Sequence, residues 1–80
     1  MDRHRLTAMI AATLNCPPES LVPESRLGEH QAWDSFGQLN IMLALEQEFG
    51  IEINDETIRR FSAFGEILNL ATPPQPSRPF

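Results

Sequence analysis

The feature that most constrains the fold is the apolar stretch from Trp33 to Gly50, WDSFGQLNIMLALEQEFG. Near its start, Asp34 and Ser35 are residue types that accept hydrogen bonds from the free N–H groups of a first helical turn. Gln38 follows Ser35 at the spacing of a capping box, and Gly50 is typical of the residue that ends a helix. The stretch therefore predicts one long helix, with either Asp34 or Ser35 as its cap.

The helix predicted over 35–49 has two apolar stripes. At helical spacing, the first stripe comprises Ile41, Met42, Leu45 and Phe49, and the second comprises Phe36, Leu39 and Leu43. A surface helix needs only one apolar face to join a core. The second stripe is therefore either covered by the rest of a small bundle or exposed as a docking surface around Ser35.

Length and charge narrow the class of protein. Eighty residues make one small domain, near the size at which a single core just suffices. The net charge is −5, and most acidic residues lie between Glu19 and Glu66. Such a surface repels phosphate backbones and anionic membranes and attracts basic docking surfaces. We therefore expect protein partners, and neither nucleic acid nor membrane.

The sequence also bears on the cellular compartment. Cys16 is the only cysteine, so an internal disulfide is excluded and a reducing compartment is compatible. The first residues lack an apolar core of signal-peptide length, and no segment approaches the roughly 20 apolar residues that span a bilayer. We expect a soluble, monomeric, cytoplasmic protein.

The chain before the central helix predicts one helix and a long connection. Residues 2–14 place their apolar side chains on one face, and Asp2 lies near the positive N-terminal end. Residues 15–34 contain the helix breakers Pro17, Pro18, Pro23 and Gly28. A connection this long in so small a domain is often functional. We expect three apolar residues to hold it on the bundle, namely Leu21, Val22 and Leu27.

The chain after the central helix predicts two short helices. The GIEIN segment alternates like a strand but has no strand to pair with, so we expect a loop that buries Ile51 and Ile53. A short helix follows over 55–60, and Ser62 is suited to cap another. The segments together predict an all-α domain.

The last residues differ in composition from the rest. Residues 72–80 are polar and rich in proline, which predicts a flexible tail after a domain that spans residues 1–71.

Ser35 is the residue best placed for a chemical role. A serine at a helix N-terminus beside an apolar stripe suits a phosphate-linked group, because the helix dipole favours negative charge there. The simpler interpretation is that Ser35 only caps the helix, and the residue types alone favour it.

Catalysis and metal binding find little support. A hydrolase built from Ser35, His30 and Asp34 is a poor candidate, because Asp34 adjoins the serine and neither a glycine elbow nor an oxyanion hole is evident. The acidic residues lack calcium-loop spacing, and the two histidines and one cysteine lack the spacing of metal ligands. We expect neither an enzyme nor a metal site.

These residues together resemble the acyl carrier proteins and related phosphopantetheine-binding carrier domains. The family's Asp-Ser-Leu attachment motif is similar to Asp34-Ser35-Phe36, and its following helix and Glu-Ile loop are similar to residues 39–53. Residues 18–27 resemble its long first loop, and residues 59–70 resemble its last two helices. The resemblance covers residues 4–70 and implies a four-helix bundle with a long first loop and a short third helix.

The resemblance implies a carrier, not an enzyme. It implies that Ser35, next to Asp34 in the attachment site, bears a 4'-phosphopantetheine arm that coenzyme A donates. The arm would hold a biosynthetic intermediate as a thioester. The implied partners are a phosphopantetheinyl transferase, an acyl- or aminoacyl-loading enzyme, and downstream enzymes that use the thioester. The residues that match the family's partner-facing positions are Phe36, Leu39, Leu43, Glu46 and Gln47.

Four residues depart from the family's usual pattern. Phe36 replaces leucine and Trp33 replaces a small residue, and we expect both to shape the surface that a partner contacts. Asn40 and Gln47 occupy positions that are frequently acidic. These departures favour a free-standing carrier in a specialised pathway over one in housekeeping fatty-acid synthesis. Two alternatives stay open: a carrier-like interaction module without a prosthetic group, and an aminoacyl or peptidyl carrier.

Overall fold

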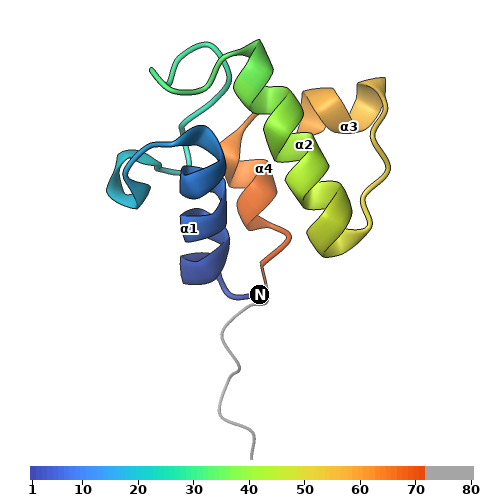
Figure 1. Ribbon diagram of the computed structural model, residues 1–80, viewed down its shortest axis with the longest axis horizontal. Helices are drawn as coiled ribbons and strands as arrows, with labels where there is room; N and C mark the ends of the chain where they lie inside the picture. The colour runs from blue at the N-terminus through green and yellow to red at the C-terminus, as the bar shows by residue number, and fades with distance from the viewer. Residues whose placement is uncertain (72–80) are drawn as a thin grey trace, which may run out of the picture.

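The computed structural model describes residues 1–71, which form a bundle of four α-helices (Figure 1). The helices are α1 (Arg3–Leu14), α2 (Ser35–Phe49), α3 (Asp55–Arg60) and α4 (Phe64–Leu68), and a 3₁₀ turn, η1 (Pro18–Ser20), lies between α1 and α2. Within this part of the chain there is no β-strand, and no helix is long and apolar enough to cross a membrane. The predicted all-α fold is confirmed, whereas the tail predicted over 72–80 lies outside the described residues.

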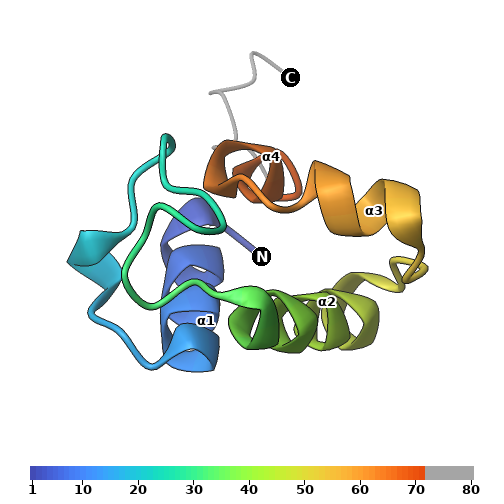
Figure 2. The ribbon, with the colours of Figure 1, turned by 90° about the horizontal axis from the view of Figure 1, so that it is seen from above.

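Helix α2 lies between α1 and α3. Helix α1 packs against α2 and α4, and α3 packs against α2 on the side away from α1 (Figure 2). Helix α2 therefore contacts both α1 and α3.

Capping residues explain where α1 and α3 begin. The Asp2 carboxylate accepts a hydrogen bond from the N–H of Arg5 at 2.8 Å. Asn54 and Thr57 form a reciprocal capping box, in which each side chain accepts from the other residue's N–H at 2.9 and 3.0 Å. Both helices lie where the sequence predicts them.

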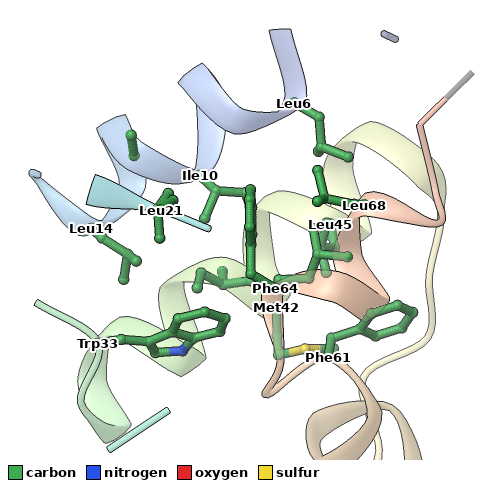
Figure 3. Packing of buried hydrophobic residues seen from close by; sticks show 13 residues of the cluster. Leu6, Ile10, Leu14, Leu21, Trp33, Met42, Leu45, Phe61, Phe64 and Leu68 are labelled. Carbon is green, nitrogen blue, oxygen red and sulfur yellow. The ribbon is translucent and has the colours of Figure 1, made fainter. Parts of the chain in front are cut away.

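The core is a single cluster that takes residues from the helices and from the long connection (Figure 3). Its buried members are Leu6, Ile10, Ala11, Leu14, Leu21, Trp33, Ile41, Met42, Leu45, Phe61, Phe64, Ile67 and Leu68. Burial of these side chains is the main source of the domain's stability.

Helix α1 approaches α2 closely at Gly37. A Cβ atom on Gly37 would lie 2.7 Å from the Cδ2 atom of Leu14, closer than real Cβ contacts come. Glycine at this position therefore lets Leu14 of α1 pack directly against the first turn of α2.

The long connection is held to the α3–α4 junction by backbone hydrogen bonds. The N–H of Leu27 donates to the carbonyl of Ser62 at 2.8 Å, and the N–H of Phe64 donates to the carbonyl of Ser25 at 2.8 Å. Leu21 is buried and Leu27 half-buried, as expected, but Val22 is exposed. The prediction for Val22 is wrong, since its side chain does not hold the connection on the bundle. At this point the backbone N–H of Val22 donates to the Ser25 hydroxyl at 3.0 Å.

The segment from α2 to α4 also shows one success and one error of prediction. The residues between α2 and α3 form a loop, as predicted, in which Ile51 and Ile53 are half-buried. Ser62 does not cap α4, because its hydroxyl donates to the carbonyl of Arg59 at 2.7 Å. Ala63 occupies the N-cap position without a side-chain hydrogen bond. The Ser62 hydroxyl therefore bonds a carbonyl at the C-terminal end of α3 instead of an N–H group at the start of α4.

Candidate functional site

Asp34, and not Ser35, caps α2. The Asp34 Oδ1 atom accepts a hydrogen bond from the N–H of Gly37 at 2.8 Å, which makes Ser35 the first residue of the helix. Ser35 is exposed, and within residues 1–71 its hydroxyl makes no hydrogen bond. The interpretation of Ser35 as a mere cap is therefore wrong, and its hydroxyl is available for chemistry.

The second apolar stripe of α2 is exposed and begins next to Ser35. Phe36, Leu39 and Leu43 are 72%, 51% and 43% exposed. On the other face, Ile41, Met42 and Leu45 are buried in the core and Phe49 is half-buried. Of the two readings that the sequence leaves open, the structure shows the uncovered stripe, and exposed apolar groups in a row are typical of a docking surface.

The other predicted partner-facing residues fall into three groups. Glu46 and Gln47 are exposed on the last turns of α2, and Asn40 is half-buried. Trp33 is only 1% exposed, so the expectation that it shapes the partner-facing surface is wrong. Its indole fills the core while its Nε1–H donates to Gln38 Oε1 at 2.7 Å, which satisfies the one polar group of the side chain (Figure 3).

Gln38 does not complete the predicted capping box. Its side chain is 3% exposed and lies against α3, where its Nε2 atom donates to the carbonyls of Ile58 and Phe61. The spacing from Ser35 to Gln38 matches a capping box. In the structure, however, the Gln38 amide donates to buried carbonyls and not to the start of α2.

A pocket of about 260 Å³ adjoins Ser35. Its walls come from α2, α3 and the long connection, through Leu27, Ser35, Gln38, Leu39, Met42 and Ile58. This pocket is not evident from the sequence, because Leu27 and Ile58 lie outside α2 and only the fold brings them beside it. A larger hollow of about 620 Å³ is lined by α1, η1 and α4 and includes none of the predicted site residues.

His30 has a structural role in the loop that leads to Ser35. Its half-buried ring accepts a hydrogen bond from the N–H of Ala32 at Nδ1, at 3.0 Å, and lies 3.0 Å from the Ser20 hydroxyl at Nε2. The His30 side chain is therefore hydrogen-bonded within the loop. In the described residues, no group of three or more His, Cys, Asp or Glu side chains is placed to hold a metal ion.

Electrostatics at the start of α2 suit a covalently attached phosphate group. The first-turn N–H groups and the helix dipole favour negative charge at this end of α2. Asp34 uses one oxygen for the cap, and the Ser35 hydroxyl is free to form an ester. The apolar stripe and the pocket flank the serine on α2. The residues present thus fit a phosphate-linked arm at Ser35.

Comparisons with known proteins agree with this geometry. Residues 4–72 match the family model described as "Phosphopantetheine attachment site". The acyl carrier protein of Thermosynechococcus vestitus is 34% identical over 65 residues, which cover 81% of this chain and 80% of that protein. The chain belongs to the phosphopantetheine-binding acyl carrier protein family, whose cofactor is a covalently attached 4'-phosphopantetheine.

Proposed function

We propose that this chain is a carrier whose Ser35 bears 4'-phosphopantetheine through a phosphodiester. The observation that supports this proposal most directly is the free, exposed hydroxyl of Ser35 behind the Asp34 cap. When bound, the arm supplies a terminal thiol on which a carboxylic acid is held as an activated thioester. The chain tethers this cargo and leaves its chemistry to partner enzymes.

Asp34 and Ser35 have different roles at the attachment site: Asp34 caps the helix, and Ser35 forms the ester. Asp34 fixes the first turn of α2 through its bond to the N–H of Gly37, so that Ser35 stays on the surface. In the loading reaction, the Ser35 oxygen forms a bond to the pantetheine-side phosphorus of coenzyme A. The bond from that phosphorus to the adenosine half breaks, and the serine proton is lost to a base of the transferase. The new phosphodiester carries one negative charge, which the N-terminal end of α2 favours.

The exposed stripe is the proposed docking surface for the transferase and for the enzymes that load and use the cargo. Phe36, Leu39 and Leu43 offer apolar contact beside the attachment point. Glu46 and Gln47 are exposed further along α2, and Glu46 can pair with a basic partner. Tethering at such a surface raises the concentration of the cargo at each docked enzyme.

A specialised pathway is favoured by the residues of this surface. Phe36 replaces the leucine usual in the family, and Asn40 and Gln47 replace residues that are frequently acidic. The docking surface thus depends less on charge and more on apolar contact than is usual in fatty-acid carriers. Trp33 no longer supports this argument, because it is buried.

Intact-mass measurement after incubation with coenzyme A and a broad-specificity transferase tests the proposal. We expect one phosphopantetheinyl addition to the wild type and to Ser62→Ala, a serine control beside another helix, and none to Ser35→Ala. Absence of the addition in the wild type, or its persistence in Ser35→Ala, would refute the assignment. Full binding of a partner by Ser35→Ala and by unmodified protein would support an interaction module instead. The mass of the loaded protein from its native host separates acyl from aminoacyl cargo.

A further inference from the structure

Gln38 is a buried polar side chain that joins three segments of the chain. Its Oε1 atom accepts from Trp33 Nε1 at 2.7 Å, on the loop before α2. Its Nε2 atom donates to the carbonyl of Ile58 at 2.9 Å and to that of Phe61 at 3.2 Å, both at the end of α3. Both N–H groups of the amide and its oxygen are therefore used in the interior.

Trp33 fixes the orientation of this amide. An indole N–H only donates and a backbone carbonyl only accepts, so the amide satisfies all three neighbours in a single orientation. Trp33 is 1% exposed and Gln38 is 3% exposed, so water cannot readily replace either partner. The pair is a fully satisfied polar element within an apolar core.

Helix α3 depends on Gln38 to an unusual degree. It has six residues, none of them buried, and a helix of that length is not stable alone. The carbonyls of its last turn lack partners within the helix, and Gln38 supplies donors to that end of the segment. The two bonds act there together with the buried ring of Phe61, which directly follows α3, and the half-buried Ile58.

Gln38 and Ile58 both line the pocket beside Ser35. Four of the six residues that line this pocket belong to α2, and Ile58 is the one that α3 contributes. The position of α3 relative to α2 therefore sets the width of the pocket. Gln38 both lines the pocket and holds the helix that closes it.

We propose that Gln38, oriented by Trp33, is a positioning residue that holds α3 against α2 and so limits the pocket beside Ser35 to short acyl chains. This inference rests on the proposed carrier function, because the pocket matters only if Ser35 bears a cargo. With α3 released, the pocket opens and longer chains are sheltered as well.

Hydrogen exchange on the unmodified protein tests the positioning step. Gln38→Met keeps an unbranched side chain of similar size but removes both N–H donors. We expect the amides of Ile58 and Phe61 to exchange on the order of tenfold faster, since the two hydrogen bonds to the end of α3 are lost together with the one from Trp33. Amides of α1 should change much less, and the exposed-glutamine control Gln31→Met should change neither region. Equal acceleration of α1 and α3, or no acceleration of α3, would overturn the role of Gln38.

Thioester cleavage in loaded protein tests the limit on chain length. Carriers loaded with saturated acyl chains of graded length are treated with hydroxylamine, and intact mass reports both the arm and the remaining thioester. We expect the wild type to protect the thioester from hydroxylamine only when the acyl chain is short. In Gln38→Met, thioesters of longer chains should be protected as well. Trp33→Phe, which keeps an aromatic ring but is smaller and loses the N–H, should show a smaller shift than Gln38→Met, because both Gln38 donors to α3 remain.

The outcomes separate the two proposals. An unchanged length profile in Gln38→Met would overturn the inference while the measured arm still supports the carrier function. Failure to attach any arm would overturn the carrier function, whereas the exchange result on unmodified protein would still decide whether Gln38 holds α3.

Discussion

Helices α1 and α3 flank α2 on opposite sides, and they are held there by different forces. Helix α1 is held by packing, because Leu6, Ile10 and Leu14 are buried and Leu14 reaches the backbone of α2 at Gly37. Helix α3 buries none of its own six residues and is held by the Gln38 amide together with Phe61, the buried residue that follows its last turn. Apolar packing of α1 contributes to global stability, whereas a few hydrogen bonds at an edge can break locally. We therefore expect the α1 side to be the more rigid half of the domain and the α3 side to be the half that opens locally more easily.

The largest expected effect follows from removing packing on the α1 side. Ile10 is fully buried, so Ile10→Ala should lower the free energy of unfolding by about 2–5 kcal/mol, measured by urea denaturation. Because a domain this small has little stability to spare, Ile10→Val provides a milder variant with an expected loss of about 0.5–1.5 kcal/mol. An unchanged urea midpoint in both variants would show that α1 is not the rigid half.

A methyl group at the α1–α2 contact should also destabilise the domain. In Gly37→Ala, the clash with Leu14 costs about 1–3 kcal/mol, and better helix propensity offsets about 1 kcal/mol of it. We expect a net loss on the order of 1 kcal/mol in urea denaturation. Gln47→Ala, an exposed change on the same helix, should stay within about 0.5 kcal/mol. A Gly37→Ala variant more stable than the wild type would mean that α1 moves aside easily.

The two caps allow a matched comparison of the halves. Asp2→Ala and Asn54→Ala each remove the N-cap of one helix, a loss of about 0.5–2 kcal/mol. We expect Asp2→Ala to lower the global free energy of unfolding. Asn54→Ala should mainly speed amide exchange in α3, with a smaller global effect. Equal global losses in the two variants would show that α3 unfolds only with the rest of the domain.

The same difference between local and distant interactions decided what the sequence could predict. Caps act between neighbours, so the starts of α1 and α3 depend on residues close in sequence, such as Asp2 and Asn54. The two stripes of α2 were also readable, but which one is exposed depends on where α1 and α4 pack. The buried positions of Gln38 and Trp33 could not be predicted. The carbonyl partners of Gln38 lie at positions 58 and 61, on α3 and just after it, and no local pattern marks them. The pocket escaped prediction for the same reason.

The smallest expected effect on stability lies on the exposed face of α2, where the effect on function should be large. Phe36 is 72% exposed, so Phe36→Ala should change the free energy of unfolding by less than about 0.5 kcal/mol. If the stripe is the docking surface, removing this ring should lower the kcat/KM of phosphopantetheinyl transfer about tenfold, the effect typical of an aromatic residue central to an interface.

The matched control is Val22→Ala, which removes part of another exposed apolar side chain, 47% exposed, in the long connection. It should change neither stability nor transfer, because Val22 lies outside the stripe of α2. Equal transfer rates for Phe36→Ala and Val22→Ala would show that exposure alone does not make the α2 stripe a docking surface. A selective loss in Phe36→Ala would instead tie the uncovered face of α2 to recognition, while its covered face serves the core.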